Sequence, residues 1–409
     1  MQTHLSPEFA GTAEGAEAEA ILRKCVHCGF CTATCPTYQV LGDELDGPRG
    51  RIYLIKQVLE GEVPTEKTQL HLDRCLTCRN CESTCPSGVQ YGRLVDIGRR
   101  IVEEKVPRGA ASRALRWSLK EGLTSPVFGP AMKLGQTVRG LLPSVLKAKV
   151  PARQDAGRWP SRTHPRKVLM LAGCVQPSMA PNINSATARV LDAAGIQTVV
   201  APEAGCCGAV KFHLNDQAGG LAQMRRNIDA WWPSVERGEV EALVMNASGC
   251  GVTVREYGHH LQHDEAYAAK ARRISELTRD LGELLPDLVP ALRSRVRPPQ
   301  GVLAYHPPCT LQHGQKLRGG VETHLQQLGF TVRVAMNESH LCCGSAGTYS
   351  VLHPDIATTL RDRKLGHLGE LQPTAVISAN IGCITHLQGG TGLPVRHWVE
   401  VLDEAIAPA

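Results

Sequence analysis

Eight of the sixteen cysteines occur in two copies of one closely spaced run. The copies read Cys25-x-x-Cys28-x-x-Cys31-x-x-x-Cys35-Pro36 and Cys75-x-x-Cys78-x-x-Cys81-x-x-x-Cys85-Pro86. Thiolates at i, i+3 and i+6 allow one loop to bind three corners of a four-iron cube, and a more distant fourth cysteine completes the set. The spacing therefore predicts two [4Fe-4S] clusters.

The fourth cysteine of each run is expected to bind the cluster of the other run, as in two-cluster ferredoxins. The crossed ligand sets are then Cys25, Cys28, Cys31 and Cys85 for one cluster, and Cys75, Cys78, Cys81 and Cys35 for the other. Proline after the fourth cysteine ends each loop, because its ring fixes φ and biases the preceding residue away from helix.

Zinc and disulfides are the alternatives for these runs. Structural zinc sites use two separated pairs of ligands, whereas each run here has three cysteines at intervals of three and a fourth before proline. Disulfide frameworks are typical of small secreted domains, yet residues 1–20 are acidic and rich in alanine, with no apolar signal segment. We therefore expect reduced thiols in a cytoplasmic protein.

The other eight cysteines form two copies of a sparse pattern, in which each vicinal pair precedes glycine. They are Cys174, Cys206, Cys207 and Cys250, then Cys309, Cys342, Cys343 and Cys383. Matching cysteines lie 135, 136 and 133 residues apart, which indicates an internal repeat. Buried inert cysteines are the alternative, but they do not explain the double recurrence. Two adjacent cysteines are also sterically unsuited to form a disulfide with each other, which favours metal binding or redox chemistry.

Predicted strands precede these cysteines in both copies. They cover residues 167–173, 197–201 and 242–246 in the first copy and 301–305, 331–335 and 374–379 in the second. Strands that alternate with helices predict parallel α/β sheets, whose ligands gather at the carboxyl ends of the strands. Each repeat should therefore bring its four cysteines to one edge, where they could hold an additional iron–sulfur cluster.

The segment between the two close-spaced runs is predicted to be helical. Within residues 50–61 the apolar positions recur at helical spacing, at Ile52, Ile55, Val58 and Leu59. We expect Pro48, Arg49 and Arg51 to form a solvated helix start. The alternative is that the arginines place positive charge near a cluster and favour its reduction.

The expected fold is multidomain, α and α/β, because 409 residues exceed one typical domain. We expect a helical two-cluster ferredoxin domain over residues 1–106, a basic linker with prolines over 107–166, and cysteine-rich repeats over 167–297 and 298–409. No uninterrupted apolar run reaches the roughly 18 residues of a transmembrane helix.

Positive charge is concentrated between Lys105 and Lys167. This segment has fourteen lysines and arginines against two acids, a local charge of +12 in a chain of net charge +6. Apolar residues alternate with basic ones here as in a basic amphipathic helix, at Val127, Phe128, Met132, Leu134, Val138, Leu141, Leu142, Val145 and Leu146 among Lys133, Arg139, Lys147 and Lys149. A linker packed on its own protein is one interpretation; docking on anionic lipid or an acidic partner is another. Nucleic acid is not expected, because aromatics are only 4%.

Three sequence segments, together with the cysteine patterns, carry a family resemblance. They are PRGRIYLIKQVLEG (48–61), NESHLCCGSAGTYS (337–350) and SANIGCITHL (378–387). Nearly the whole chain resembles the iron–sulfur subunits of bacterial glycolate dehydrogenase (glycolate oxidase). The resemblance implies that a separate flavin subunit oxidises glycolate to glyoxylate. This chain would carry the electrons to quinone or another acceptor, with no catalytic residue of its own, in the cytoplasm or peripherally on the inner membrane.

Related subunits leave other functions open. The iron–sulfur subunits of lactate and glycerol-3-phosphate dehydrogenases share the architecture. Heterodisulfide reductase subunits end each repeat with Cys-x-x-Cys, whereas Thr253 and His386 stand at the last positions here. His386 could be an extra ligand, but a lone histidine, like His306, His313 or His340, is more often structural. A thiol or disulfide reductase is thus the second function class. The sequence has no GxGxxG run after a predicted strand, which argues against hydride chemistry within this chain.

Overall fold

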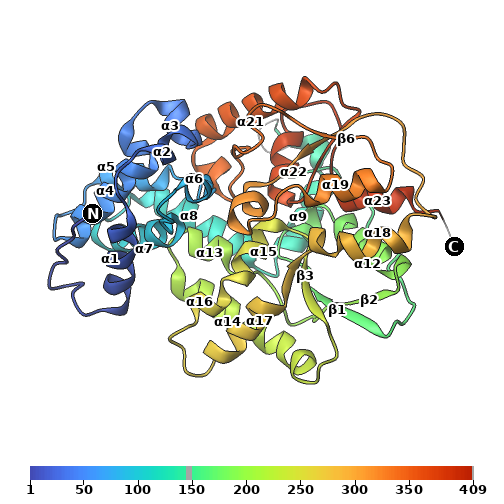
Figure 1. The fold of residues 1–409 in the computed structure, drawn as a ribbon, viewed down its shortest axis with the longest axis horizontal. Helices are drawn as coiled ribbons and strands as arrows, with labels where there is room; N and C mark the ends of the chain where they lie inside the picture. The colour runs from blue at the N-terminus through green and yellow to red at the C-terminus, as the bar shows by residue number, and fades with distance from the viewer. Residues whose placement is uncertain (144–149, 408–409) are drawn as a thin grey trace. The chain divides into compact units, whose positions relative to one another are not determined.

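The computed structural model describes residues 1–143 and 150–407, which form two compact units (Figure 1). The smaller unit contains residues 1–116 and 340–364, and the larger contains residues 117–339 and those from 365 onward. The segment 340–364, which belongs to the second repeat in sequence, thus groups with the N-terminal residues. The domain boundaries set out above stay predictions. Val145, Leu146, Lys147 and Lys149 of the predicted amphipathic helix lie outside the described residues.

The smaller unit is helical, as predicted for the two-cluster region. Its helices are α1 (Ala13–Lys24), α2 (Phe30–Ala33), α3 (Pro36–Leu41), η1 (Glu44–Asp46), α4 (Pro48–Leu59), α5 (Glu66–Asp73), α6 (Asn80–Thr84), α7 (Tyr91–Lys105), α20 (Tyr349–Leu352) and the first part of α21 (Pro354–Gly369). The predicted apolar stripe of α4 is buried and packs into the core with Leu22 of α1 and Leu94 of α7. This packing fixes the helices that flank both cysteine runs.

A buried ionic network lies at the start of α4. Arg51 is only 1% exposed, donates from Nε to the carbonyl of His71 at 2.7 Å, and pairs with Asp46, which is fully buried. Arg74 also pairs with Asp46, at 2.8 Å. The prediction of a solvated helix start is therefore wrong for Arg51. A buried guanidinium requires a paired carboxylate to offset the loss of water, and helical periodicity does not reveal such a partner.

The larger unit contains two four-stranded parallel sheets, which confirms the duplicated α/β fold. The first has the order β2-β1-β3-β4 and the second β6-β5-β7-β8. Their strands are β1 (Arg166–Met170), β2 (Ile196–Val199), β3 (Ala242–Met245), β4 (Thr278–Asp280), β5 (Leu303–His306), β6 (Val332–Val334), β7 (Ala375–Ser378) and β8 (Val395–His397). Figure 1 shows β1, β2 and β3 side by side. The sequence analysis did not predict β4 or β8. Each strand has only three residues, some of them polar, so neither shows a recognisable hydrophobic pattern.

Helices surround the sheets and join the two repeats. They are α9 (Phe128–Thr137), η2 (Arg139–Leu141), α11 (Gln176–Met179), α12 (Asn182–Ala193), α13 (Ala209–His213), α14 (Gln217–Glu236), α15 (Ser248–Arg255), α16 (Tyr257–His260), α17 (Ala268–Leu277), η3 (Leu281–Leu284), α18 (Leu285–Leu292), η4 (Thr310–Gly314), α19 (Gly320–Gln327), α22 (Ile381–Gln388) and α23 (Trp398–Ala405). Arg189 on α12 pairs with Asp403 on α23 at 2.6 Å, which ties the first repeat to the second.

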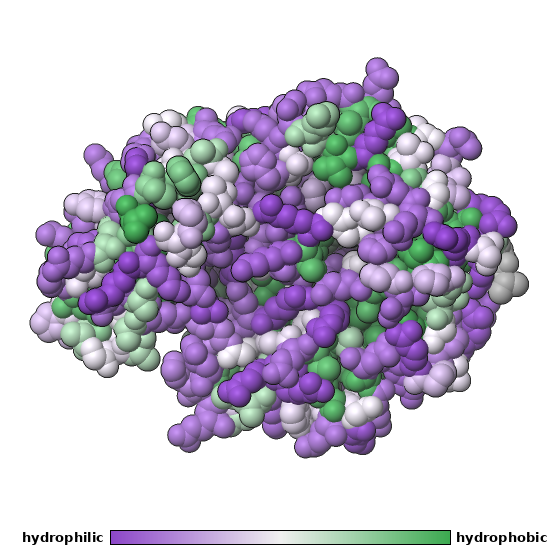
Figure 2. Space-filling view, in the orientation of Figure 1, coloured by the Kyte–Doolittle hydropathy of each residue, from purple (hydrophilic) through white to green (hydrophobic). Residues whose placement is uncertain are grey.

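The basic segment forms short helices and neutralises part of its charge within the protein. Helix α8 (Ala110–Thr124) begins it. Arg108 and Arg116 both pair with Asp73, at 2.6 and 2.8 Å, and Lys120 pairs with Asp216 at 3.2 Å. Hydrophobic residues are scattered among hydrophilic ones on the face shown in Figure 2. Within the described residues, no helix has the length and apolar character needed to cross a bilayer.

Glycine after each vicinal cysteine pair is required by the backbone. Gly208 and Gly344 have φ of +98° and +90°. A Cβ at Gly208 would lie 2.9 Å from the carbonyl oxygen of Gly220 in α14, and one at Gly344 would lie 2.4 Å from that of Ala357 in α21. The pair in each repeat is therefore held against the helix that follows it by close backbone packing.

We predict that Gly344→Ala destabilises the protein by roughly 2–4 kcal/mol, because it adds left-handed strain and a clash with α21. Gly347→Ala is the matched control: its φ is +63°, but a Cβ there meets nothing within 4 Å. It should cost only about 1 kcal/mol. Urea unfolding monitored by circular dichroism measures both values, and equal losses would contradict the packing requirement.

Candidate iron–sulfur sites

Both close-spaced runs adopt the same coiled loop. His27 and Gly29 in the first run, and Thr77 and Arg79 in the second, have positive φ of 57°, 84°, 50° and 57°. Three of the four are not glycine, and each such residue costs about 1–3 kcal/mol. The second loop also donates a backbone N–H from Thr77 to Cys75 Sγ at 3.4 Å. Strain repeated at matching positions shows that the tertiary structure imposes the loop shape.

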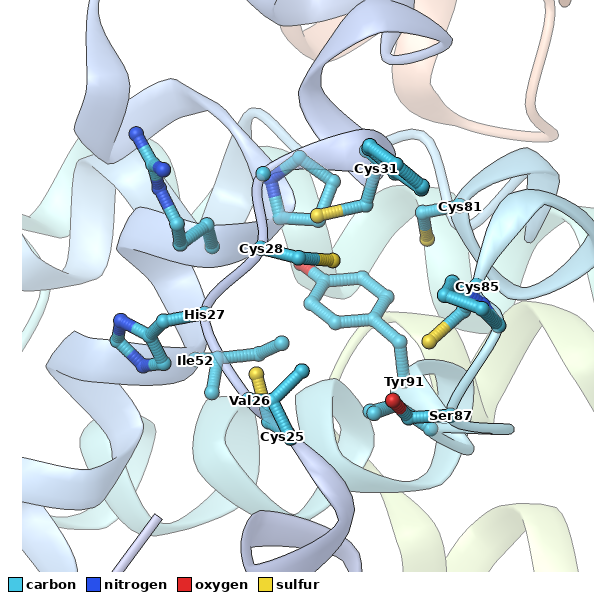
Figure 3. Close-up of a pocket in the computed structure, with 16 residues that line it drawn as sticks. Cys25, Val26, His27, Cys28, Cys31, Ile52, Cys81, Cys85, Ser87 and Tyr91 are labelled. Atoms are coloured by element: carbon cyan, nitrogen blue, oxygen red, sulfur yellow. The ribbon is translucent and has the colours of Figure 1, made fainter.

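The first loop and the end of the second run surround one pocket. Cys25, Cys28, Cys31 and Cys85 all line it, together with Cys81 of the second run, and Figure 3 shows the sulfurs of the four turned toward a shared space. Burial, followed by the charges of the neighbouring Cys25, Cys28 and Cys85, raises the pKa of Cys31 to about 11. Cys85 therefore lies with the first run, although sixty residues separate it from Cys25.

The second loop and the end of the first run surround another pocket. It is lined by Cys75, Cys78, Cys81 and Cys35. Burial raises the pKa of the Cys81 thiol well above its ordinary value, and the charges of Cys78, Cys75 and Cys35 act in the same direction. The structure thus brings together the residues of each expected set; their binding of separate clusters stays a prediction.

Each pocket has the donor set that a four-iron cluster requires. Thiolates that converge in one site repel one another, and this repulsion adds to burial, the larger cause, in raising the pKa of Cys31 and of Cys81. Iron replaces thiol protons and compensates the negative charge, so cluster binding relieves the repulsion. The residues present therefore fit two [4Fe-4S] clusters, which supply one-electron redox chemistry when bound.

The two sets differ in exposure and in surroundings. Cys28 is exposed, and its neighbours Val26 and Phe30 are 68% and 60% exposed. In the second set, by contrast, only Cys78 is more than slightly exposed. The first set therefore presents an apolar rim, defined as Val26, Cys28 and Phe30, at the surface.

Buried polar groups surround the second set, and sequence reasoning missed most of them. Tyr91 donates from Oη to Cys75 Sγ at 3.6 Å. Arg99 is buried and donates to the carbonyl of Cys75 at 2.6 Å. Arg51 acts electrostatically on Cys75 and Cys35. These donors and cations stabilise negative charge at the second set. Arg51 thus lies beside this set, and its effect on cluster reduction stays a prediction. Cysteine spacing gives no signal for Tyr91 or Arg99, which lie on α7.

The four cysteines of the first repeat converge at the carboxyl edge of the first sheet. Their thiols form a hydrogen-bonded chain from Cys174 to Cys206, Cys207 and Cys250. Hydrogen bonds from Cys174 and Cys207, and from the backbone N–H groups of Gly208 and Val210, hold the pKa of Cys206 well below its ordinary value. Four convergent sulfur donors with one stabilised thiolate fit a metal centre.

Two buried side chains hold the first vicinal pair. Asn227 accepts from the N–H of Gly205 and donates to the carbonyl of Cys206, both at 2.8 Å. Tyr257 donates to the carbonyl of Cys207 at 2.8 Å and accepts from Asn227 at 3.0 Å. Such outer contacts orient ligands. Thr253 donates to the carbonyl of Gly249 at 3.1 Å, a local helix contact, so it does not replace the missing fifth cysteine.

The cysteines of the second repeat are divided between the compact units. Cys342 and Cys343 belong to the smaller unit, whereas Cys309 and Cys383 belong to the larger. In the larger unit, buried His306 offers a ring nitrogen within 4.8 Å of Cys383 Sγ. The first repeat has Leu171 at the matching position. Because the strands of the two repeats look alike in sequence, this difference between His306 and Leu171 was not noticed. The position beside Cys383 makes His306 a stronger candidate ligand than the sequence indicated.

Both cysteine-rich parts of the chain match known family models. Residues 21–89 match the family model of a 4Fe-4S dicluster domain, and residues 168–255 and 303–388 match that of a cysteine-rich domain. The glycolate oxidase iron-sulfur subunit of Escherichia coli (strain K12) is 56% identical over 99% of both chains.

Two other relatives are less similar to this chain. The probable glycolate oxidase iron-sulfur subunit of Bacillus subtilis (strain 168) is 29% identical over 91% of this chain and 89% of its own. Lactate utilization protein A of Exiguobacterium sp. is 22% identical over 59% of this chain and 99% of its own. The identity and coverage shared with the Escherichia coli protein place this chain in the family of glycolate oxidase iron–sulfur subunits.

Proposed function

We propose that this chain is the electron-transfer subunit of an enzyme complex that oxidises glycolate to glyoxylate. A separate flavoprotein subunit removes the electrons from glycolate, and this chain conducts them toward quinone or another acceptor. The observation that carries the proposal is the presence of two pockets in one helical unit, each lined by at least four cysteines, which differ in exposure. Lactate is the second substrate candidate, because relatives named for lactate utilization match more than half of the chain.

The two crossed ligand sets, in this proposal, hold one cluster each. Cys85 completes the first set and Cys35 the second, which the lining of the two pockets supports. The apolar rim at Val26, Cys28 and Phe30 serves as the contact for the flavoprotein, since apolar groups that fringe an exposed redox site can be desolvated on docking. Buried hydrogen-bond donors surround the second set. The cluster of that set therefore acts as the carrier that passes electrons on within the protein.

The four thiols of the first repeat hold a third cluster in this proposal. Their hydrogen-bonded chain and the lowered pKa of Cys206 support a bound cation. Four sulfur ligands suffice for one four-iron cluster. The cysteines of the second repeat stay a sequence-based prediction for a similar site.

The basic segment supports peripheral contact with anionic lipid. Trp117, Val127, Leu134 and Leu141 are between 64% and 88% exposed, and Lys133 lies among them in sequence. Exposed apolar residues beside basic ones bind the interface of anionic membranes. We place the complex on this basis at the cytoplasmic face of the inner membrane.

The substrate and the docking rim are tested together. When the complex that co-purifies with this chain is mixed anaerobically with glycolate, the iron–sulfur absorbance should bleach, and lactate should act more slowly. The double variant Val26→Ser/Phe30→Ser should slow bleaching roughly tenfold, as loss of a docking contact worth about 1.4 kcal/mol would. Val63→Ser removes an apolar group of the smaller unit that is 84% exposed and lies outside the rim, and it is the control. No bleaching with glycolate would refute the function; equal rates in both variants would refute the rim.

Metal content tests the four-thiol site of the first repeat. Anaerobic iron and acid-labile sulfide should each fall by about four per chain in the variant Cys174→Ser/Cys250→Ser, because one four-iron cluster is lost. The eight cysteines of the crossed sets should retain about eight irons in that variant. Unchanged iron, or loss of a single zinc ion, would show that the first repeat does not hold a cluster.

Vesicle sedimentation tests the membrane proposal. The full chain should bind vesicles that contain phosphatidylglycerol more tightly than those of phosphatidylcholine alone, and salt should weaken the binding. Leu134→Asp/Leu141→Asp should lower the affinity about tenfold, since two apolar contacts are lost and negative charge is added. Met336→Asp, at a residue of the larger unit that is 97% exposed, should have little effect. Equal binding to both lipids would contradict the proposal.

A further inference from the structure

A histidine stands at the carboxyl end of an inner strand of the second sheet. His306 is the last residue of β5 and is only 1% exposed. The register of the sheet pairs it with Ser378, the last residue of β7, whose Oγ donates to the carbonyl of His306 at 2.8 Å. Bound groups gather at this edge of parallel sheets. The strand pairing therefore holds the backbone of His306 at the edge where a ligand is expected.

Two buried cysteines follow the strands at the same edge. Cys383 lies on α22, directly after β7, and its Sγ is within 4.8 Å of a ring nitrogen of His306. Cys309 follows His306 by three residues, after two prolines. Proline fixes its own φ and biases the preceding residue toward extended backbone, so the connection from His306 to Cys309 is stiff. The larger unit therefore supplies one imidazole and two cysteines from one edge, a nitrogen and sulfur donor set that suits iron–sulfur centres.

Asn380 holds the side chain of Cys383 in place. Its Nδ2 donates to Cys383 Sγ at 3.6 Å, and its Oδ1 accepts from the backbone N–H of Gly249 at 3.3 Å. Gly249 directly precedes Cys250, a member of the four-thiol site of the first repeat. Outer hydrogen bonds of this kind orient the ligands of a metal centre. One amide therefore orients Cys383 and connects it with the backbone of the first-repeat site.

The first repeat has an apolar side chain at the equivalent position. Leu171 precedes Cys174 by three residues, as His306 precedes Cys309, and it packs into the core of the first repeat. The first-repeat site therefore offers thiols alone, whereas the second adds an imidazole. An imidazole ligand is neutral and a thiolate ligand is negatively charged, so the two repeats differ in the charge that they can place on a metal centre.

We propose that His306, together with Cys309 and Cys383, binds a four-iron cluster in the second repeat, with the imidazole on one iron in place of a thiolate. This assignment rests on the proposed function, in which the chain carries electrons through bound clusters. Cys342 and Cys343 stay sequence-based candidates for the remaining thiolate. Exchange of thiolate for imidazole raises the potential of an iron–sulfur centre. The second-repeat cluster is therefore easier to reduce than the all-thiolate cluster of the first repeat, and electrons pass from the first repeat to the second.

Pulsed electron paramagnetic resonance on the anaerobically purified, reduced full chain tests the imidazole ligand. Protein labelled with nitrogen-15 histidine should show the strong nitrogen coupling of an imidazole bound to cluster iron. The coupling should vanish in His306→Ala and persist in His386→Ala, the matched control at the other candidate histidine of this repeat. Absence of the coupling in the wild type, or its survival in His306→Ala, would overturn the inference.

His306→Cys restores a ligand and tests the potential, also where His306→Ala does not fold. Iron should stay near about sixteen per chain, as four four-iron clusters require. The signal that carries the nitrogen coupling in the wild type should become roughly tenfold harder to reduce, a shift of about 59 mV for one electron, while the other signals keep their midpoints. An unchanged midpoint would contradict the imidazole ligand. About twelve irons in the wild type would overturn this inference and leave the proposed function standing, whereas fewer than about eight would refute the clusters of the proposed function itself.

Discussion

The convergence of each close-spaced run with the last cysteine of the other is the constraint on which the smaller unit depends. Cys85 lines the pocket of the first run and Cys35 that of the second, so neither pocket is complete without both runs. The helical insert between the runs, α4, packs against α7 and places Arg51 beside the second set. Strained loops at His27, Thr77 and Arg79 persist because this packing over-determines them. We therefore expect metal binding and folding of this unit to be coupled.

The two cysteine-rich repeats hold their vicinal pairs with different side chains. Both repeats place a vicinal pair after a parallel strand and fix it with a glycine of positive φ against the next helix. The first pair is held by Asn227 and Tyr257 within its own unit, whereas the second pair is anchored through Tyr349. The two repeats thus share the backbone conformation at the vicinal pair but differ in the side chains that hold it. This difference allows the second pair to be anchored to the ferredoxin-like region.

Sequence reasoning predicted the helical and α/β parts and the repeat, because cysteine spacing and alternating strands are local patterns. It missed β4 and β8, whose three residues carry little hydrophobic signal. It also expected Arg51 to be solvated, since the partner that makes its burial favourable, Asp46, belongs to another element. The grouping of residues 340–364 with the N-terminal unit involves tertiary hydrogen bonds through Asn80 and Tyr349, which no spacing pattern encodes.

Iron-edge anomalous diffraction from anaerobically grown crystals of the full chain tests the central claim most directly. The account predicts two separate iron peaks in the smaller unit, one bounded by Cys25, Cys28, Cys31 and Cys85 and the other by Cys75, Cys78, Cys81 and Cys35. A peak enclosed by the four cysteines of a single run, with Cys35 beside Cys31 or Cys85 beside Cys81 as its fourth ligand, would contradict it.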